Sequence, residues 1–282
     1  GQSADIAPAD KKLYALRDVT ATVDSIPLIA SSIMSKKLAA GSDKIVLDVT
    51  VGSGAFMKDK ENAVQLAEKM VAIGNGAGKK TVAILTNMDV PLGKMVGNNL
   101  EVVEAIETLK GRGPEDLIAV VVEIASTMLY LAQIGTKEEC MKKVKRVIAD
   151  GSALEKLKLM VERQGGDGSY IENPDQFEKA IYQQEIIANN SGYIGTMNTE
   201  ECGKAAVLLG AGREVKDDPI DMTAGIQFNK KTGDAVKQGD IVAIAYSSSK
   251  EKLQQGVQKI SDIYDIVDKR PQVVPEIIGY IE

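Results

Sequence analysis

Apolar and polar positions repeat with two different periods along the chain, and the period changes near residue 41. Residues 10–40 carry apolar positions at helical spacing, with an interruption before Pro27. Proline breaks a helix interior but is tolerated in a first turn. The pattern therefore predicts two helices, the second running from about Pro27 to Ala40 and ending at Gly41. Lys44–Thr50 is a mostly apolar run of strand length, as in a strand that is covered on both faces.

Helical and strand-like stretches continue to alternate through the middle of the chain. A helix is predicted over Asp59–Ile73 and a second buried strand over Thr81–Met88. The order strand, helix, strand implies a right-handed crossover and a parallel sheet. Four more helices follow, and the capping-box pair Thr136 and Glu139 marks the start of one of them. From Gln184 onward, short β-prone runs separated by turns replace the long helices.

The order of these elements predicts an α/β fold in three parts. Residues 1–42 are expected to form part of a small all-helical lobe, residues 43–180 a mixed α/β domain, and residues 181–282 a C-terminal subdomain. The run Gly233–Ile244 resembles half of a lipoyl- or biotinyl-type β-hammerhead. That likeness suggests a rival function as a non-catalytic carrier or interaction module. The modified lysine of such carriers lies in the turn after this strand, where this chain has serines, and Lys250 comes slightly late.

Composition excludes several classes of function. The 282 residues carry a net charge of −6, so nucleic acid is not expected as a partner. Two cysteines suit a reducing compartment, and no apolar run approaches the roughly 20 residues that cross a bilayer, so a cytoplasmic protein without membrane contact is expected. The chain has no histidine, which excludes imidazole as an acid, base or metal ligand within it.

The first two predicted helices carry the candidate binding groups. Tyr14 and Arg17 are three residues apart and Ser32 and Lys36 four apart, so each pair shares one helix face. A planar guanidinium, an ammonium, a hydroxyl and an aromatic ring suit a small planar ligand with carbonyl oxygens and a ring NH. The alternative is that these cations only cover a solvated surface, and spacing alone favours that alternative.

A glycine-rich loop, Gly52-Ser53-Gly54, follows the first predicted strand. Such a loop before a helix could hold a phosphate on its free amides. A full dinucleotide fingerprint would need glycine where Met57 stands, so a tight strand-to-helix turn is the preferred interpretation. A nucleotide-binding α/β protein remains as a second rival function.

One long stretch resembles a known family. Residues 13–29, Leu-Tyr-Ala-Leu-Arg-Asp-Val-Thr-Ala-Thr-Val-Asp-Ser-Ile-Pro-Leu-Ile, are followed by Ser-Ile-Met-Ser-Lys-Lys at 32–37. Together they closely resemble the pyrimidine-base site of bacterial pyrimidine-nucleoside and thymidine phosphorylases. The likeness continues, more loosely towards the C-terminus, through Leu47–Val49, Gly52–Met57, Pro91–Gly93 and Gly97-Asn98.

The resemblance implies an activity and a binding site. The activity is phosphorolysis of pyrimidine (deoxy)nucleosides to free base and (deoxy)ribose 1-phosphate, a step of nucleotide salvage. Arg17, Ser32 and Lys36 would hold the edge of the base with Tyr14 beside it. Arg17 and Lys36 would also be catalytic, because their charges stabilise the leaving base. The resemblance further implies a homodimer and no organic cofactor.

The resemblance also implies an ion site and a missing phosphate site. A potassium ion would be bound by the carbonyl oxygens of Leu92 and Met95 and by Glu104. The phosphate-binding Lys-His-Ser-Thr-Gly-Gly run of the family has no match here, and Thr50 stands where the family usually has lysine. We therefore expect the chain to correspond to the C-terminal two-thirds of such an enzyme. We expect it to need the N-terminal portion as a partner and to be inactive alone.

Overall fold

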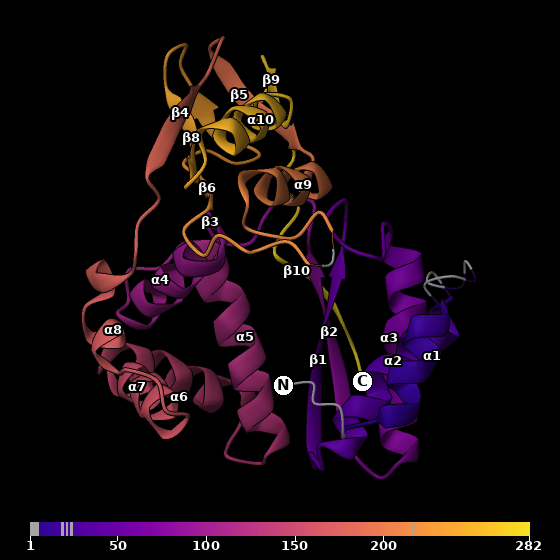
Figure 1. Cartoon of the computed structure of the whole chain (residues 1–282). Helices are drawn as coiled ribbons and strands as arrows, with labels where there is room; N and C mark the ends of the chain where they lie inside the picture. Colours follow the sequence, from indigo (N-terminus) through magenta and orange to yellow (C-terminus); the bar gives the residue numbers. More distant parts are fainter. Residues whose placement is uncertain (1–5, 18–19, 21, 23–24, 216) are drawn as a thin grey trace. The chain divides into compact units, whose positions relative to one another are not determined.

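The structure is a computed structural model that describes residues 6–17, 20, 22, 25–215 and 217–282 (Figure 1). Its helices are α1 (Pro8–Arg17), α2 (Ile26–Ala39), α3 (Lys60–Gly76), α4 (Asn98–Leu109), α5 (Glu115–Leu131), α6 (Lys137–Ala149), α7 (Ser152–Arg163), α8 (Ser169–Glu172), α9 (Thr199–Leu209) and α10 (Lys250–Ser261), with a 3-10 turn η1 (Pro174–Gln176). Its strands are β1 (Lys44–Val51), β2 (Lys80–Asn87), β3 (Met95–Gly97), β4 (Tyr182–Ile187), β5 (Gly192–Met197), β6 (Gly225–Phe228), β7 (Ala235–Val236), β8 (Ile241–Ser247), β9 (Tyr264–Val267) and β10 (Ile277–Ile281).

The predicted elements of the first half are present. α2 has Ser25 at its N-cap and Pro27 in its first turn, and Gly41, with a φ of 77°, follows its end. β1 pairs in parallel with β2, with Lys44 opposite Lys80, and α3 connects the two strands. The α/β class is therefore confirmed.

Close contacts divide the chain into two compact units. Unit 1 consists of Gly1–Asn87, Val120–Lys143 and Pro275–Glu282, and unit 2 of Met88–Ala119 and Val144–Val274. The division falls within α5 and within α6, so it follows neither of the predicted boundaries at residues 42 and 180.

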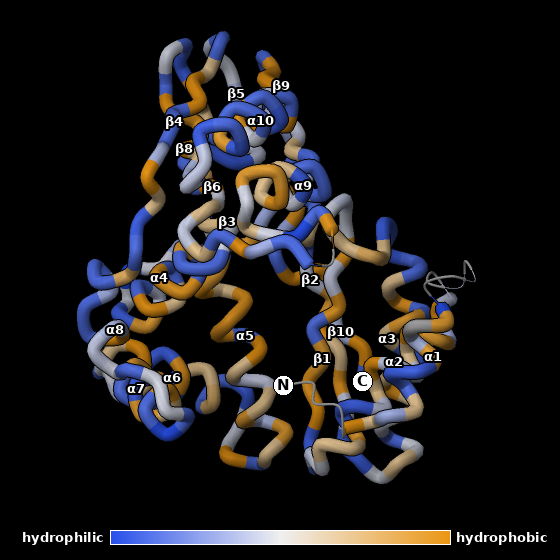
Figure 2. Tube along the Cα trace, viewed as in Figure 1, coloured by the Kyte–Doolittle hydropathy of each residue, from blue (hydrophilic) through white to orange (hydrophobic). Residues whose placement is uncertain are grey.

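Unit 1 is built on a three-stranded sheet in the order β1-β2-β10. α3 packs on β1 and β2, and α2 packs on α3. Ala30 and Met34 of α2 are buried in the same hydrophobic core as Ile45 and Leu47 of β1. The strands of this unit are largely hydrophobic along their length (Figure 2). α2 is therefore a layer of the α/β unit, which differs from the separate helical lobe predicted for residues 1–42.

The last strand of the chain belongs to unit 1. β10 pairs antiparallel with β2, with Ile277 opposite Thr86 and Ile281 opposite Ala83. The final segment of the predicted C-terminal part, residues 181–282, therefore belongs to the sheet of unit 1. No local pattern reveals this, because the edge that β10 covers lies on β2, far away in sequence.

Unit 2 contains the two remaining sheets, in the orders β3-β6-β8-β4 and β7-β5-β9. All of their strand pairs are antiparallel. α9 and α10 pack against each other and on these strands. The largest completely buried side chains of this core are Ile194, Leu209, Ile226, Phe228 and Ile260.

None of the described helices combines the length and the apolar character needed to cross a bilayer.

Candidate functional site

A small cavity of about 160 Å³ in unit 1 contains all four predicted base-site residues. α1 supplies two of them and α2 the other two, and the loop after β1 adds an aromatic ring. The residues that line the cavity are Tyr14, Arg17, Ile29, Ser32, Ile33, Lys36 and Phe56. The spacing argument for shared helix faces is therefore correct, since each helix presents its pair to the same space.

The Lys36 ammonium is held by three oxygen atoms. Its Nζ donates to the carbonyl oxygen of Ser32 at 3.1 Å and to the Ser32 hydroxyl at 3.0 Å. The third partner is Oδ2 of Asp10, at 2.8 Å. An ammonium has three N–H bonds, so these acceptors match its donors one for one. A ligand oxygen that binds Lys36 must share or replace one of them.

Asp10 is a site residue that the sequence reasoning missed. α1 begins at Pro8, so Asp10 lies inside the first turn, and its side chain is 10% exposed. Burial opposes its ionisation, but the hydrogen bonds from Lys36 and Ser32 and the charges of Lys36 and Arg17 together outweigh burial and lower the pKa of Asp10. A signal was present in the sequence, since Asp10, Tyr14 and Arg17 have the spacing of a single helix face.

Arg17 is buried and fixed by backbone oxygens. Its Nε donates to the carbonyl oxygen of Thr22 and its Nη1 to that of Leu28, both at 3.3 Å. The guanidinium lies 5.4 Å from the centre of the Tyr14 ring, within the range of a cation–π contact. Arg17 is thus positioned before any ligand arrives, which lowers the entropy cost of using it.

The glycine loop after β1 closes on itself. The amide of Gly52 donates to the carbonyl oxygen of Met57, and the amide of Ala55 donates to that of Gly52. Lys58 Nζ donates to the carbonyl oxygen of Ser53 at 2.7 Å. These bonds support the interpretation as a tight turn, because the amide of Gly52 in the loop and that of Ala55 directly after it are already used.

The predicted ion ligands lie together in unit 2. Leu92, Met95 and Glu104 line one cavity of about 450 Å³. Glu104 is 8% exposed, and its Oε1 accepts the amide of Lys94 at 2.8 Å while Oε2 accepts that of Met95 at 3.4 Å. The carboxylate therefore faces the loop, and these two hydrogen bonds run to loop amides.

The surroundings of Glu104 disfavour the charged form of its carboxyl group. Burial raises the pKa of Glu104, the two amide bonds oppose that rise, and nearby Asp116 adds to it. Lys231 is the cation that offsets part of the effect. The approach of Glu104 also requires a glycine, because a Cβ atom on Gly93 would lie 2.3 Å from Oε2.

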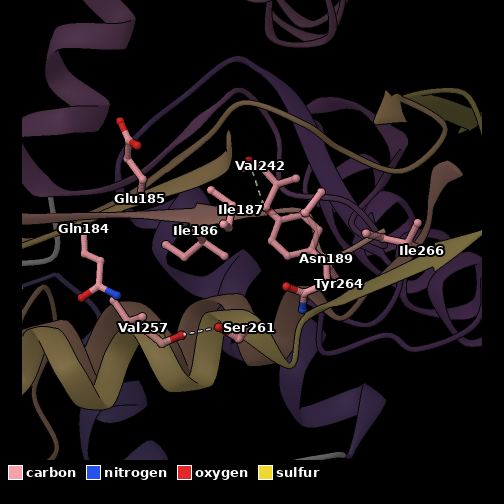
Figure 3. Close-up of a pocket in the computed structure, with 11 residues that line it drawn as sticks. Gln184, Glu185, Ile186, Ile187, Asn189, Val242, Val257, Ser261, Tyr264 and Ile266 are labelled. Carbon is pink, nitrogen blue, oxygen red and sulfur yellow. Dashed lines mark hydrogen bonds between the residues drawn. The ribbon is translucent and has the colours of Figure 1, made fainter. Parts of the chain in front are cut away.

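A third cavity, of about 250 Å³, lies in unit 2 between β4 and α10. Figure 3 shows residues of β4 above Val257 and Ser261 of α10. Its two hydroxyl groups are already bonded, Ser261 Oγ to the carbonyl oxygen of Val257 and Tyr264 Oη to that of Val242. The polar side chains of Gln184, Glu185 and Asn189 also line this cavity.

The carrier interpretation loses its structural basis. Lys250 is the first residue of α10, and Ser249 caps that helix by accepting the amide of Lys252. β8 thus leads into a helix rather than into the β-turn that presents a carrier lysine.

Two parts of the chain match known protein families. Residues 1–154, more than half of the chain, match the family described as "Glycosyl transferase family, a/b domain". Residues 193–267 match "Pyrimidine nucleoside phosphorylase C-terminal domain".

Several curated relatives carry the same kind of name. The chain is 50% identical to the "Pyrimidine-nucleoside phosphorylase" of Staphylococcus haemolyticus over 94% of its own length and 61% of the relative. It is 48% identical to the proteins of that name from Bacillus subtilis and Staphylococcus aureus over 99% of its length and 65% of theirs. The chain thus spans somewhat less than two-thirds of these relatives. It belongs to the pyrimidine-nucleoside phosphorylase family of glycosyl transferases.

Proposed function

We propose that this chain supplies the pyrimidine-binding part of a nucleoside phosphorylase. The reaction joins phosphate to the anomeric carbon of a pyrimidine nucleoside or deoxynucleoside and releases the base. A phosphate oxygen forms a bond to the carbon as the bond from carbon to base nitrogen breaks, which gives a pentose 1-phosphate.

The observation that carries this proposal is the convergence of Arg17, Ser32, Lys36 and Tyr14 on one cavity. A pyrimidine offers carbonyl oxygens and a ring NH at its edge and a flat ring face. The two cations and the hydroxyl suit the edge, and the Tyr14 ring suits the face.

The same groups suit the transition state. The electron pair of the breaking bond passes into the pyrimidine ring and its oxygens, so the leaving base becomes negative. Arg17 and Lys36 are cations fixed beside this site, and fixed charges stabilise developing charge most when water is excluded.

The binding half of the proposal is tested with the chain and free uracil by isothermal titration calorimetry. Replacing Lys36 by alanine removes a charged hydrogen-bond donor and is expected to weaken uracil binding about 10–100-fold. Lys37→Ala is the matched control, because Lys37 is the next residue and is exposed. Equal affinity of Lys36→Ala and the unchanged chain would remove Lys36 from the site, and no uracil binding at all would reject the proposal.

The phosphate half is proposed to lie outside residues 1–282. These residues contain no histidine and no Lys-His-Ser-Thr run, and the amides of Gly52 and Ala55, in and directly after the glycine loop, are already used. Positioning the nucleophile contributes on the order of 7–11 kcal/mol to such a reaction. We therefore expect no phosphate-dependent release of base from uridine by this chain, and release by a longer polypeptide with the phosphate-binding run. Turnover by the chain itself would show that the phosphate site lies within it.

We propose that a potassium ion binds at the carbonyl oxygens of Leu92 and Met95 and at Glu104. Hard oxygen ligands suit an alkali cation. The buried Glu104 carboxylate, with its raised pKa, supports the proposal because a nearby cation would offset the cost of its charge.

We also infer a homodimer. Apolar side chains of α1 and α2 are exposed, among them Leu13, Leu16 and Leu28. Light scattering tests this inference, and a mass equal to the 30.1 kDa of one chain would contradict it.

A further inference from the structure

Lys231 reaches back across a long stretch of sequence to the loop that carries the proposed ion ligands. Its Nζ donates to the carbonyl oxygens of Pro91 at 2.9 Å and Gly93 at 2.8 Å. It also forms a short ion pair with Oδ2 of Asp116. Three oxygen atoms thus surround one ammonium, again one for each N–H bond.

Both partners of this pair are held rigidly and are largely withdrawn from water. The Lys231 and Asp116 side chains are each 18% exposed. The Lys231 amide donates to Oδ2 of Asp234, and the Asp234 amide donates to the Lys231 carbonyl oxygen, so the turn that carries Lys231 is fixed. Asp116 Oδ2 also accepts the amide of Gly93 at 3.1 Å.

The loop is therefore held from two sides by opposite charges. Carboxylates of Asp116 and Glu104 accept amides of Gly93 and Lys94, while the Lys231 ammonium takes the carbonyl oxygens. Carbonyl and carboxylate oxygens around a cation are the ligand set of an alkali-metal site. Here a side chain of the protein supplies the cation.

We propose that the Lys231 ammonium is a tethered cation, which occupies an alkali-ion-like oxygen cage formed by Pro91, Gly93 and Asp116. Its role is to position the Pro91–Met95 loop. The cage is separate from the site proposed at Leu92, Met95 and Glu104, and the inference stands whether or not this protein is a phosphorylase. If the ammonium is removed, the cage keeps its charge and oxygens and accepts a free cation instead.

The test is thermal unfolding of Lys231→Met in potassium chloride and in tetramethylammonium chloride of equal ionic strength. Tetramethylammonium is too large for the cage and has no N–H bond. We expect potassium to raise the unfolding midpoint of Lys231→Met by about 2–4 °C more than it raises that of the unchanged chain. Because Lys231 also offsets part of the Glu104 charge, the comparison is repeated with Glu104→Gln in both chains, which removes the carboxylate of the other proposed ion site. The extra response to potassium should persist in that background.

Two further variants sharpen the test. Lys230→Met is the matched control, because the Lys230 ammonium donates to the carbonyl oxygen of Ala235, away from the cage, and it should respond to potassium like the unchanged chain. Adding Asp116→Asn to Lys231→Met neutralises the cage. The double variant should lose the extra response and be more stable than Lys231→Met in tetramethylammonium chloride.

The outcomes separate a tethered cation from an ordinary salt bridge. Equal destabilisation of Lys231→Met in both salts would overturn the proposal, and so would a double variant less stable than the single one. If Lys231→Met does not fold in tetramethylammonium chloride, folding in potassium chloride supports the proposal, as does folding of the double variant. Failure of both variants to fold in either salt counts against it.

Discussion

Single residues decide how the cations of the base site are held. Asp10 and Lys36 lie on neighbouring helices, and their contact joins α1 to α2 through one ion pair at 2.8 Å. The pair also keeps the Lys36 ammonium beside Ser32 instead of in solvent. Asp10 is therefore a positioning residue whose contribution should be visible in stability.

The Asp10 contribution should depend on pH. The folded pKa of Asp10 is lowered, so its stabilising effect is present above the unfolded pKa of about 3.9 and is lost as pH falls through the folded value. Asp10→Asn should lower the free energy of unfolding at neutral pH by about 1 kcal/mol. Urea unfolding at pH 7 and at pH 3 measures this, and the difference between the variant and the unchanged chain should shrink at the lower pH.

A matched substitution isolates the effect of burial. Asp43 pairs with Lys79 at 3.2 Å but is 87% exposed. Asp43→Asn should change the free energy of unfolding by less than about 0.5 kcal/mol at either pH. Similar losses in the two variants would mean that the Asp10 pair is only a surface contact.

Local spacing could predict some of these residues but not others. Tyr14 with Arg17 and Ser32 with Lys36 are near neighbours on helices, so periodicity alone places each pair on one face. Lys231 and Asp116 are 115 residues apart in the sequence, and nothing near either one indicates the other. Their meeting depends on how sheets and loops pack, which a single sequence does not display.

The helices and longer strands are the elements that the sequence specifies best. The capping box of α6 is confirmed in both directions, because the Thr136 amide donates to Glu139 and the Glu139 amide donates to the Thr136 hydroxyl. β3, β7 and β9 have only two to four residues each, which are too few to show measurable alternation of apolar and polar positions.

The loop between β2 and α4 provides a prediction for the ion site. Potassium chloride should raise the unfolding midpoint of the unchanged chain relative to tetramethylammonium chloride, and Glu104→Gln should abolish that response. In tetramethylammonium chloride, Glu104→Gln should be no less stable than the unchanged chain. The reason is that the raised pKa of Glu104 makes its charge unfavourable to folding above the unfolded pKa.

A neighbouring carboxylate is the control for this loop. Glu101 lines the same cavity and accepts the amide of Gly97 at 3.0 Å, but it is exposed. Glu101→Gln should retain the potassium response. If Glu104→Gln retains it as well, the ion does not bind at Glu104.

At the scale of the whole molecule, β10 brings the C-terminal segment into one sheet with β1 and β2. Its isoleucines Ile278 and Ile281 pack against the core of unit 1. Deleting residues 275–282 should expose the edge of β2 and lower the free energy of unfolding by roughly 2–5 kcal/mol. Urea unfolding measures the loss, and hydrogen exchange should speed up at the β2 amides.

A peptide of residues 275–282 offers a direct control for this deletion. Added to the shortened chain, it should slow exchange in β2 again, while a scrambled peptide of the same composition should not. Unchanged exchange in β2 after the deletion would mean that β10 adds little to the sheet.

The pairing of β10 with β2 also has a consequence during protein synthesis. Between the end of β2 at Asn87 and the start of β10 at Ile277 lies all of unit 2. β2 is therefore synthesised long before β10, and the edge of β2 stays unpaired while unit 2 is synthesised. Open strand edges are the surfaces through which unfinished chains associate wrongly. Slow translation of unit 2, or a bulky tag fused directly after β10, should therefore increase misassembly of unit 1.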